Sequence, residues 1–219
     1  NNPLGDILGF AQLAAKYPEL PEQVHKDLER IAKSSMYARE IIKKILMFSR
    51  PMSPRKTRVN LNTLVEEWVG VVESQCSTKG VELSLVLEEK LPEIAGDPYQ
   101  LNQVLVNLVN NAVDAMPEGG ILTIKTFAKK ASVYLVVLDT GIGMNCETFD
   151  KIFMPFFTTK DVDKGTGLGL SVAYGIVEAH GGSITAESTE GQGATFEIEI
   201  PLRHKDSGNH GQEKIQQSV

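Results

Sequence analysis

The sequence has only two cysteines, a single tryptophan and no long apolar run. Cys76 and Cys146 lie far apart and form no CxxC pair, which favours two free thiols in a reducing compartment over a disulfide or a metal site. No apolar run approaches the roughly 18 residues of a membrane-spanning helix, and a signal-peptide pattern is missing. We therefore expect a cytoplasmic chain without a membrane segment, although a longer parent could carry a sensor or a membrane anchor upstream.

The chain also has no excess of basic residues over acidic ones. The net charge is −6, and the basic residues are scattered apart from short groups such as Lys43-Lys44. Such a chain lacks the broad basic surface that binds nucleic acid, so nucleic acid is not an expected partner. The composition, 42% hydrophobic and 23% charged over 219 residues, is typical of a globular domain with a smaller additional element.

Apolar residues recur at helical spacing in two segments near the N-terminus. The first covers residues 7–14 and ends before Pro18, because the residue preceding a proline is driven out of the α region. The second covers residues 21–49. Residues 1–50 are thus predicted to form a helical hairpin whose apolar face is too large to bury alone, and two copies would form a four-helix bundle. The alternative is that the hairpin packs on the rest of its own chain.

Residues 51–59 contain two prolines and three basic residues, a composition that predicts a linker and a domain boundary. Helices and strands then mix. Predicted helices cover residues 63–77 (capped by Asn62), 101–115 and 170–179, and predicted strands cover 81–86, 121–127, 133–138, 183–188 and 194–200. This order predicts helices on one face of a mixed sheet over residues 60–202. Residues 203–219 are polar without periodicity and predict a disordered tail.

A glycine-rich loop precedes the helix predicted at residues 170–179. It reads Gly165-Thr166-Gly167-Leu168-Gly169. Glycines let backbone N–H groups point inward, and the start of a helix adds partial positive charge, so such a loop suits phosphate groups. A plain turn is the alternative, because many glycine-rich loops bind nothing.

Polar residues interrupt the otherwise apolar helix of residues 101–115. Asn107 and Asn111 are four residues apart and share one face, and Asn110 and Asp114 form a second such pair. Buried polar groups need partners, and amide oxygens are hard ligands that suit Mg²⁺. The alternative is an asparagine that hydrogen-bonds a neighbouring loop.

An acidic residue and two glycines follow the apolar strand at residues 133–138. They are Asp139, Gly141 and Gly143. A carboxylate at a strand end accepts a hydrogen bond from an exocyclic amine, which favours adenine over guanine, and glycines let the base approach the backbone. The alternative is an ordinary Asp-Gly turn.

A phenylalanine-rich segment lies between these two motifs, at residues 152–160. Its Phe-Phe-Thr-Thr-Lys sequence is bounded by a proline and precedes the glycine loop, as expected for the anchor of a mobile lid rather than core filler. Lys160 is a candidate phosphate partner, and a solvated surface lysine is the alternative.

The order of these segments resembles sensor histidine kinases. N-L-V-N-N-A, D-T-G-I-G, F-M-P-F-F and G-T-G-L-G-L look like the family's N, G1, F and G2 boxes, and G-Q-G-A-T-F is similar to its closing loop. The resemblance covers residues 60–201 and implies the two-layer α/β sandwich shared with gyrase and MutL, the GHKL ATPase fold.

The resemblance also implies ATP and Mg²⁺ as cofactors, with Asn111 on Mg²⁺, Asn107 supporting it and Asp139 on the adenine amine. The loop Gly165 to Gly169 would hold the phosphates. Further nucleotide-binding residues would be Asp114, Gly141, Gly143, Lys160, Thr166, Gly167, Leu168 and Thr195. The ATP lid would cover residues 154–166 and is short, similar to the nitrogen-regulatory type of kinase.

The first four residues, Asn1-Asn2-Pro3-Leu4, resemble the end of an H box of the H-E-x-x-N-P-L type. The phosphoacceptor histidine of that motif would lie upstream of Asn1, so it is missing from this sequence. Asn2 matches the position that orients water in the family's phosphatase reaction. The histidines present, His25, His180, His204 and His210, lack the H-box context. We interpret His25 as exposed and His180 as a helix C-terminal residue.

The combined interpretation is an α+β protein: a helical hairpin that dimerises, followed by an ATP-binding sandwich. The resemblance implies a homodimer through residues 1–50 that moves the γ-phosphoryl of ATP to a histidine and then to an aspartate on a response regulator receiver domain. This chain would bind Mg·ATP but label itself poorly, because the acceptor is missing.

Three alternatives compete with this interpretation. A gyrase- or MutL-like ATPase predicts a catalytic glutamate on the Asn107–Asn111 helix, and none lies between Tyr99 and Met116. A nucleotide-gated interaction module would use ATP only to order the lid. A purely structural dimer would not need these boxes in this order.

Overall fold

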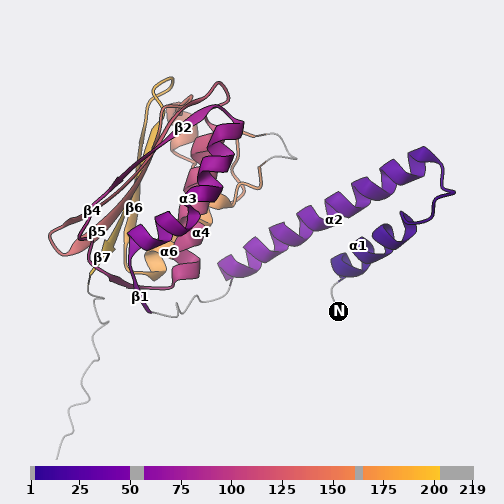
Figure 1. Cartoon of the computed structure of the whole chain (residues 1–219), viewed down its shortest axis with the longest axis horizontal. Helices are drawn as coiled ribbons and strands as arrows, with labels where there is room; N and C mark the ends of the chain where they lie inside the picture. The colour runs from indigo at the N-terminus through magenta and orange to yellow at the C-terminus, as the bar shows by residue number, and fades with distance from the viewer. Residues whose placement is uncertain (1–2, 50–56, 161–164, 203–219) are drawn as a thin grey trace, which may run out of the picture. The chain divides into compact units, whose positions relative to one another are not determined.

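The computed structural model describes residues 3–49, 57–160 and 165–202, with the side chains of 40, 41 and 43–49 left aside (Figure 1). These residues form two compact units, one of residues up to 49 with 151–175 and the other of residues 57–150 with 176–202. Several predictions fall outside the described residues: Asn2, the first six residues of the 51–59 linker, lid residues 161–164, and the 203–219 tail with His204 and His210.

The first unit contains the predicted helical hairpin. Helix α1 covers Pro3–Ala14 and helix α2 covers Glu22–Ser49, and the two pack against each other. Among the side chains described in the hairpin, only Ala11 and Ser35 are buried. His25 is half-buried rather than exposed, which corrects the interpretation made from the sequence. The large apolar side chains described in the hairpin are therefore exposed or only half-buried.

The second unit is built on a five-stranded sheet. Its strands are β2 (Val81–Leu87), β4 (Gly120–Lys129), β5 (Ser132–Asp139), β7 (Ala194–Pro201) and β6 (Ser183–Ser188), in the order β2-β4-β5-β7-β6. Both predicted hairpins, β4–β5 and β6–β7, are confirmed as antiparallel pairs, whereas β2 runs parallel to β4. The sheet is thus mixed, as expected.

Helices α3 (Leu61–Thr78) and α4 (Pro98–Asp114) lie on one face of this sheet (Figure 1). The apolar residues predicted to face inward from the second of these helices are all buried: Leu101, Val104, Leu105, Leu108, Val109, Ala112 and Val113. Alternate residues of the central strands β5 and β7 complete the core between the layers, among them Val137 and Phe196. Helix α6 (Gly169–Ala179) confirms the helix expected after the glycine loop.

Short elements depart from the sequence prediction. Strand β1 (Thr57–Val59) lies within the expected linker and pairs with β3 (Ile94–Gly96), and helix α5 covers Cys146–Phe149. None of them was predicted, because three or four residues carry too little periodicity to detect.

Two helix starts also differ from the prediction. Asn60, rather than Asn62, caps α3 by accepting the Asn62 N–H, while the Asn62 side chain bonds the Thr126 hydroxyl and the Glu88 carbonyl. Asp97 caps α4, which begins before the predicted Leu101. Both real caps are residue types that the Ncap position favours.

Both cysteines are free thiols, as expected, with Cys76 buried and Cys146 exposed. Within the described ranges, none of the helices combines the length and the apolar content needed to cross a bilayer.

Candidate functional site

The Asp139 carboxylate is the most deeply buried polar side chain among the predicted site residues that the structure describes. Asp139 ends β5, is 4% exposed, and its Oδ1 accepts the N–H groups of Gly141 at 2.9 Å and Ala194 at 3.3 Å. Burial raises the pKa of the Asp139 carboxyl above its ordinary value of 3.8, while these two hydrogen bonds act to lower it. A buried acid fixed on one oxygen leaves the other oxygen for a further partner.

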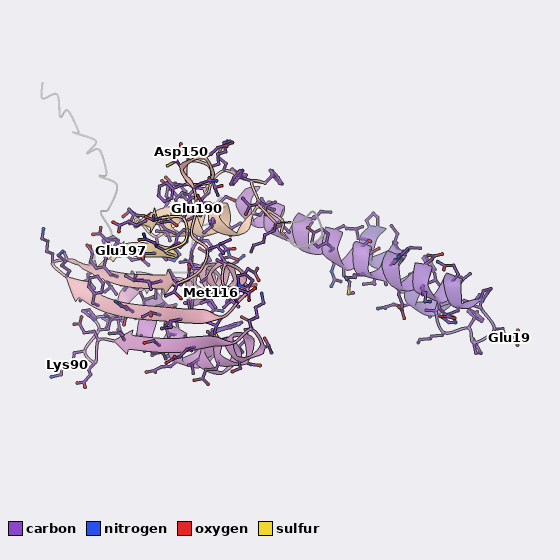
Figure 2. All side chains as sticks on the ribbon, turned by 90° about the horizontal axis from the view of Figure 1, so that it is seen from above. Glu19, Lys90, Met116, Asp150, Glu190 and Glu197 are labelled. Carbon is purple, nitrogen blue, oxygen red and sulfur yellow. The ribbon has the colours of Figure 1, made fainter. Side chains whose placement is uncertain are left out.

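The two glycines after Asp139 are required by close backbone packing. A Cβ on Gly141 would lie 2.3 Å from the Ala115 carbonyl oxygen at the end of α4. Gly143 has a φ of +61°, and a Cβ there would lie 2.0 Å from the Thr189 carbonyl oxygen. The Ile142 N–H donates to Ala115 O at 2.9 Å. The loop after β5 is therefore held between the end of α4 and the β6–β7 turn, which Met116 and Glu190 mark in Figure 2.

The sheet register decides which residues lie beside Asp139. Leu122 and Ala194 are its direct neighbours on β4 and β7, and Ser188 on β6 lies beyond Ala194. Thr195 pairs with Leu138 instead. Because side chains alternate across a strand, Thr195 lies on the opposite face of the sheet from Asp139. The structure thus separates Thr195 from Asp139 and gives the neighbouring place to Ala194, which the sequence analysis missed.

Helix α4 presents two of the predicted asparagines, Asn107 and Asn111, on one half-buried face. Asn107 and Asn111 are both partly buried, and Asn110 is exposed. The face that carries Asn107 and Asn111 is distinct from the core-facing side, because it avoids the buried positions Val104, Leu108 and Ala112. These amides remain the candidate metal ligands of the helix.

Asp114, the partner predicted for Asn110, makes a different contact. Its Oδ1 lies 2.7 Å from Nζ of Lys79, the residue that follows α3, and both side chains are about two-fifths exposed. This ion pair links the ends of α3 and α4, so the structure gives Asp114 a structural partner at the surface.

The phenylalanine segment and the glycine loop, which belong to the first unit, contact each other through their backbones. The Phe156 N–H donates to Gly167 O at 2.9 Å, and Phe156 has a φ of +67°. Gly167 also has a positive φ, +63°, and a Cβ there would lie 2.3 Å from the Phe156 carbonyl carbon. The two ends of the predicted lid are therefore joined through backbone contact, and a left-handed phenylalanine is a rare, strained conformation.

The remaining predicted loop residues occupy several environments. Leu168 is 2% exposed, so it is a core side chain. The Thr166 hydroxyl accepts the Leu168 N–H at 3.4 Å, and the Gly165 backbone lies against Thr158 and Lys160. Gly169 begins α6. Lys160 is partly buried and has interactions of its own.

Metal-ligating side chains do not gather elsewhere in the described part of the chain: no three His, Cys, Asp or Glu residues are grouped as a metal site there.

Two family models match the chain. Residues 96–204 match the histidine kinase-, DNA gyrase B- and HSP90-like ATPase, and residues 1–54 match the His Kinase A (phospho-acceptor) domain. Among solved structures, the catalytic domain of histidine kinase ThkA is 35% identical, with a TM-score of 0.61 over 68% of this chain and 96% of ThkA's domain. The chain belongs to the sensor histidine kinase family.

Other histidine kinases extend the similarity to the hairpin. Sensor histidine kinase ZraS of Escherichia coli (strain K12) is 35% identical over 92% of this chain, which spans only 43% of ZraS. The structure of full-length ShkA in complex with AMPPNP matches this chain at 26% identity with a TM-score of 0.79. The match covers 91% of this chain and 43% of ShkA. The structure of ThkA in complex with the response regulator TrrA matches this chain at 30% identity with a TM-score of 0.68. The match covers 92% of this chain and 58% of the matched chain of that complex.

Proposed function

We propose that this histidine kinase chain binds Mg·ATP and is the catalytic core that transfers its γ-phosphoryl to a histidine. The observation that carries the proposal is the buried Asp139 carboxylate at the end of β5, enclosed by glycine backbone. Supporting it, ShkA was solved with AMPPNP, an ATP analogue, and the model matched by residues 96–204 describes ATPases.

Asp139 would read the adenine. Its Oδ1 already accepts two backbone N–H groups, so its second oxygen is the acceptor for the exocyclic amine. The amine of adenine donates there, whereas guanine presents a carbonyl and would face carboxylate oxygen without a proton between them. The small side chain of Ala194, directly beside Asp139, leaves room for a flat ring. Gly141 and Gly143 complete this part of the site through their backbone.

Asn111 would hold the metal, with Asn107 one turn earlier supporting it. Amide oxygens are hard ligands, and Mg²⁺ bound this way keeps most of its shell for water and phosphate oxygens. When bound, Mg²⁺ neutralises charge that builds up on the phosphates during transfer. These residues fit Mg²⁺ by their chemistry, because α4 presents two half-buried amide side chains on one face, beside its core-facing side.

The sequence of the loop Gly165 to Gly169 suggests that its backbone N–H groups would donate to the phosphates. Lys160 would add a positive point charge beside them. Thr166 and Leu168 shape this loop, since the first accepts a loop N–H and the second anchors it in the core. Thr195 and Asp114 stay predictions from the sequence, since Thr195 lies on the opposite face of the sheet from Asp139 and the Asp114 carboxylate pairs with Lys79.

The hairpin would supply the dimer. Residues 1–50 expose the stripe Ile7, Phe10, Leu13 and Tyr17, and α2 exposes Val24, Ile31 and Ile42. Two such hairpins bury these faces in a four-helix bundle. In this organisation residues 51–59 contain the connection and residues 60–202 the catalytic domain.

The acceptor would be a histidine upstream of Asn1, five residues before Pro3, where the resemblance to the H box puts it. Its imidazole nitrogen attacks the γ-phosphorus as the bond to ADP breaks. The phosphoryl group would then pass to an aspartate of a response regulator, a partner class that ThkA binds in its complex with TrrA. Asn2, outside the described residues, would orient water in the phosphatase reaction, in which water hydrolyses that aspartyl phosphate and phosphate leaves.

A nucleotide-gated interaction module is the main rival. Both proposals predict ATP binding, but only a kinase transfers label. The match of residues 1–54 to a phospho-acceptor domain favours the kinase, and it also disfavours a gyrase-like ATPase.

The test uses a chain extended upstream of Asn1 through the H box and incubated with γ-labelled ATP. We expect acid-labile label on the histidine before Pro3, and its loss in Asp139→Asn. Label that persists in Asp139→Asn, or that maps to His25 or His180, would contradict the proposal. Unlabelled protein that still binds ATP and a partner would favour the interaction module.

A further inference from the structure

His180 has both ring nitrogens engaged inside the protein. It directly follows α6 and is 1% exposed. Its Nδ1 lies 2.7 Å from the Ile176 carbonyl oxygen, and the Asp97 N–H donates to its Nε2 at 2.9 Å. A nitrogen that accepts from an amide carries no hydrogen. The ring is therefore neutral, with its hydrogen on Nδ1, where it donates to Ile176.

The backbone of Gly96 closes against the same ring. A Cβ on Gly96 would lie 2.7 Å from Leu101 Cδ1, 3.1 Å from His180 Cδ2 and 3.4 Å from His180 Nε2. Such contacts are too short to accommodate without moving the ring or the leucine. The imidazole thus occupies a socket that is built from β3, the start of α4 and its own helix.

The socket lies at a junction of three elements. Gly96 ends β3 and pairs with Thr57 of β1, the strand that follows the 51–56 segment. Asp97 is the N-cap of α4, and its Oδ1 accepts the N–H groups of Tyr99 and Gln100. The Asp97 backbone therefore belongs at once to the strand junction and to the helix that carries Asn107 and Asn111.

We propose that His180 is a positioning residue of the ATP site: by accepting the Asp97 N–H, it fixes where α4 starts and hence where Asn107 and Asn111 lie. Asn107 is ten residues along the helix from Asp97, about 15 Å of rigid rise, so a displaced start displaces the amides. The inference rests on the proposed function, because it assumes that these amides serve bound Mg·ATP.

A purely stabilising role is the alternative. A buried hydrogen-bonded histidine contributes to stability whatever the site does, and its loss would lower the unfolding midpoint alone. The two roles differ in whether ATP affinity changes beyond what an equal loss of stability causes elsewhere.

The experiment measures ATP affinity in Mg²⁺ for wild type, His180→Leu, His180→Gln and Gly96→Ala. Leucine removes the acceptor, and glutamine keeps an amide oxygen that can reach the Asp97 N–H. Gly96→Ala keeps the imidazole but crowds its socket. The control is Ile200→Ala, a buried β7 residue opposite Val133, six residues along β5 from Asp139. Affinities are compared at temperatures equally far below each unfolding midpoint.

We expect His180→Leu to bind ATP roughly five- to tenfold more weakly, as the loss of one hydrogen bond predicts, and Gly96→Ala to weaken binding in the same direction because it displaces the ring. His180→Gln should recover most of the affinity, and Ile200→Ala should bind like wild type. The proposal is overturned if His180→Leu binds ATP like wild type, or if Ile200→Ala weakens binding as much.

Two measurements on nucleotide-free protein separate a failure of this inference from a failure of the proposed function. Nitrogen NMR should show His180 as the neutral Nδ1–H form, and the Asp97 amide should exchange slowly in wild type and rapidly in His180→Leu. A charged ring, or an Asp97 amide equally protected in both, overturns the role of His180 whether or not ATP binds. If wild type shows both signatures but does not bind ATP, the ATP assignment is contradicted, and the positioning role with it. His180 would then only stabilise the fold.

Discussion

The helical hairpin and the α/β sandwich bury their apolar residues to very different extents. In the hairpin, Phe10 is 73% exposed and the only apolar side chain buried, among those described, is Ala11. In the sandwich, Leu108, Leu122 and Val133 are completely buried between helices and sheet. The two parts contain similar kinds of apolar residue, and they differ in whether those side chains are covered by a second layer of the same unit.

This difference shows which part can stand alone. The sandwich closes its own core, as a two-layer domain does, so its stability should be independent of concentration. The hairpin has only one layer of two packed helices, and in the proposed dimer a second copy would remove its apolar stripe from water. The exposed hairpin and the closed sandwich are therefore expected to respond differently to the same kind of substitution.

The largest effect is expected for Leu108→Ala in the core of the sandwich. Removing a completely buried leucine side chain from α4 should lower the free energy of unfolding by about 2–5 kcal/mol. Denaturant unfolding measures it. The matched exposed change Leu13→Ala, in α1, should leave the sandwich transition unmoved, and an equal loss from both would remove the contrast between the two parts.

A smaller effect is expected for Gly143→Ala. Alanine at a φ of +61° costs about 1–2 kcal/mol, and its Cβ would in addition meet the Thr189 carbonyl at 2.0 Å. Gly191→Ala is the control, because Gly191 has a similar φ of +78° and open space around it. Thermal unfolding should show Gly143→Ala as clearly the worse of the two. Equal losses would mean that the backbone contact between the loop after β5 and the β6–β7 turn is not required.

Phe10→Ala should weaken the dimer and spare the sandwich. If the exposed ring is buried against a second copy, its truncation should cost roughly 1.5 kcal/mol of association, about a tenfold rise in the dissociation constant. Sedimentation at several concentrations measures it, with the exposed polar change Glu29→Ala as the control. A wild-type chain that is monomeric at every concentration would instead support the alternative that the hairpin is covered by its own chain.

The smallest effect is a gain. Gly70 lies inside α3 with nothing near the place of a Cβ, so Gly70→Ala should stabilise the sandwich by about 0.5–1 kcal/mol. Gly9→Ala in α1 is an equally open position in the hairpin. Its gain should be visible in the concentration-dependent transition and absent from the sandwich transition.

The sequence predicted the long elements well because their periodicity is strong. The α4 core positions and both antiparallel strand pairs carry enough apolar repeats to fix type and face. The parallel pairing of β2 with β4 carries no comparable local signal, since it depends on how α3 and α4 pack. Strands β1 and β3 are too short to detect and are defined only by pairing with each other.

The sequence motifs identified the residues of the candidate site. They did not show which residue of the neighbouring strand pairs with each of them. Asp139 follows an apolar strand, and its place at a strand end could be read directly. Which residue stands beside it depends on a one-residue difference in pairing, and the structure puts Ala194 rather than Thr195 there. His180 follows its helix as expected, but its burial against Asp97 joins segments 83 residues apart, and no local pattern encodes such a contact.

Asp139 also gives the account a pH signature. Burial raises its pKa in the folded chain above the unfolded value near 3.8, so the folded state binds its proton more tightly. The resulting stability is present below that value and is lost as pH rises through the raised pKa. ATP binding should have the opposite dependence, because the adenine amine needs the ionised carboxylate as acceptor.

The most direct test of the central claim is therefore ATP affinity in Mg²⁺ as a function of pH, by calorimetry, for wild type and Asp139→Asn. The account predicts saturable wild-type binding at neutral pH that weakens as the pH falls toward the raised pKa of Asp139. It predicts binding roughly 10- to 100-fold weaker in Asp139→Asn, as the loss of a charged acceptor implies. Equal affinity of the two proteins at neutral pH would contradict the assignment of Asp139 to the adenine, and with it the proposed ATP site.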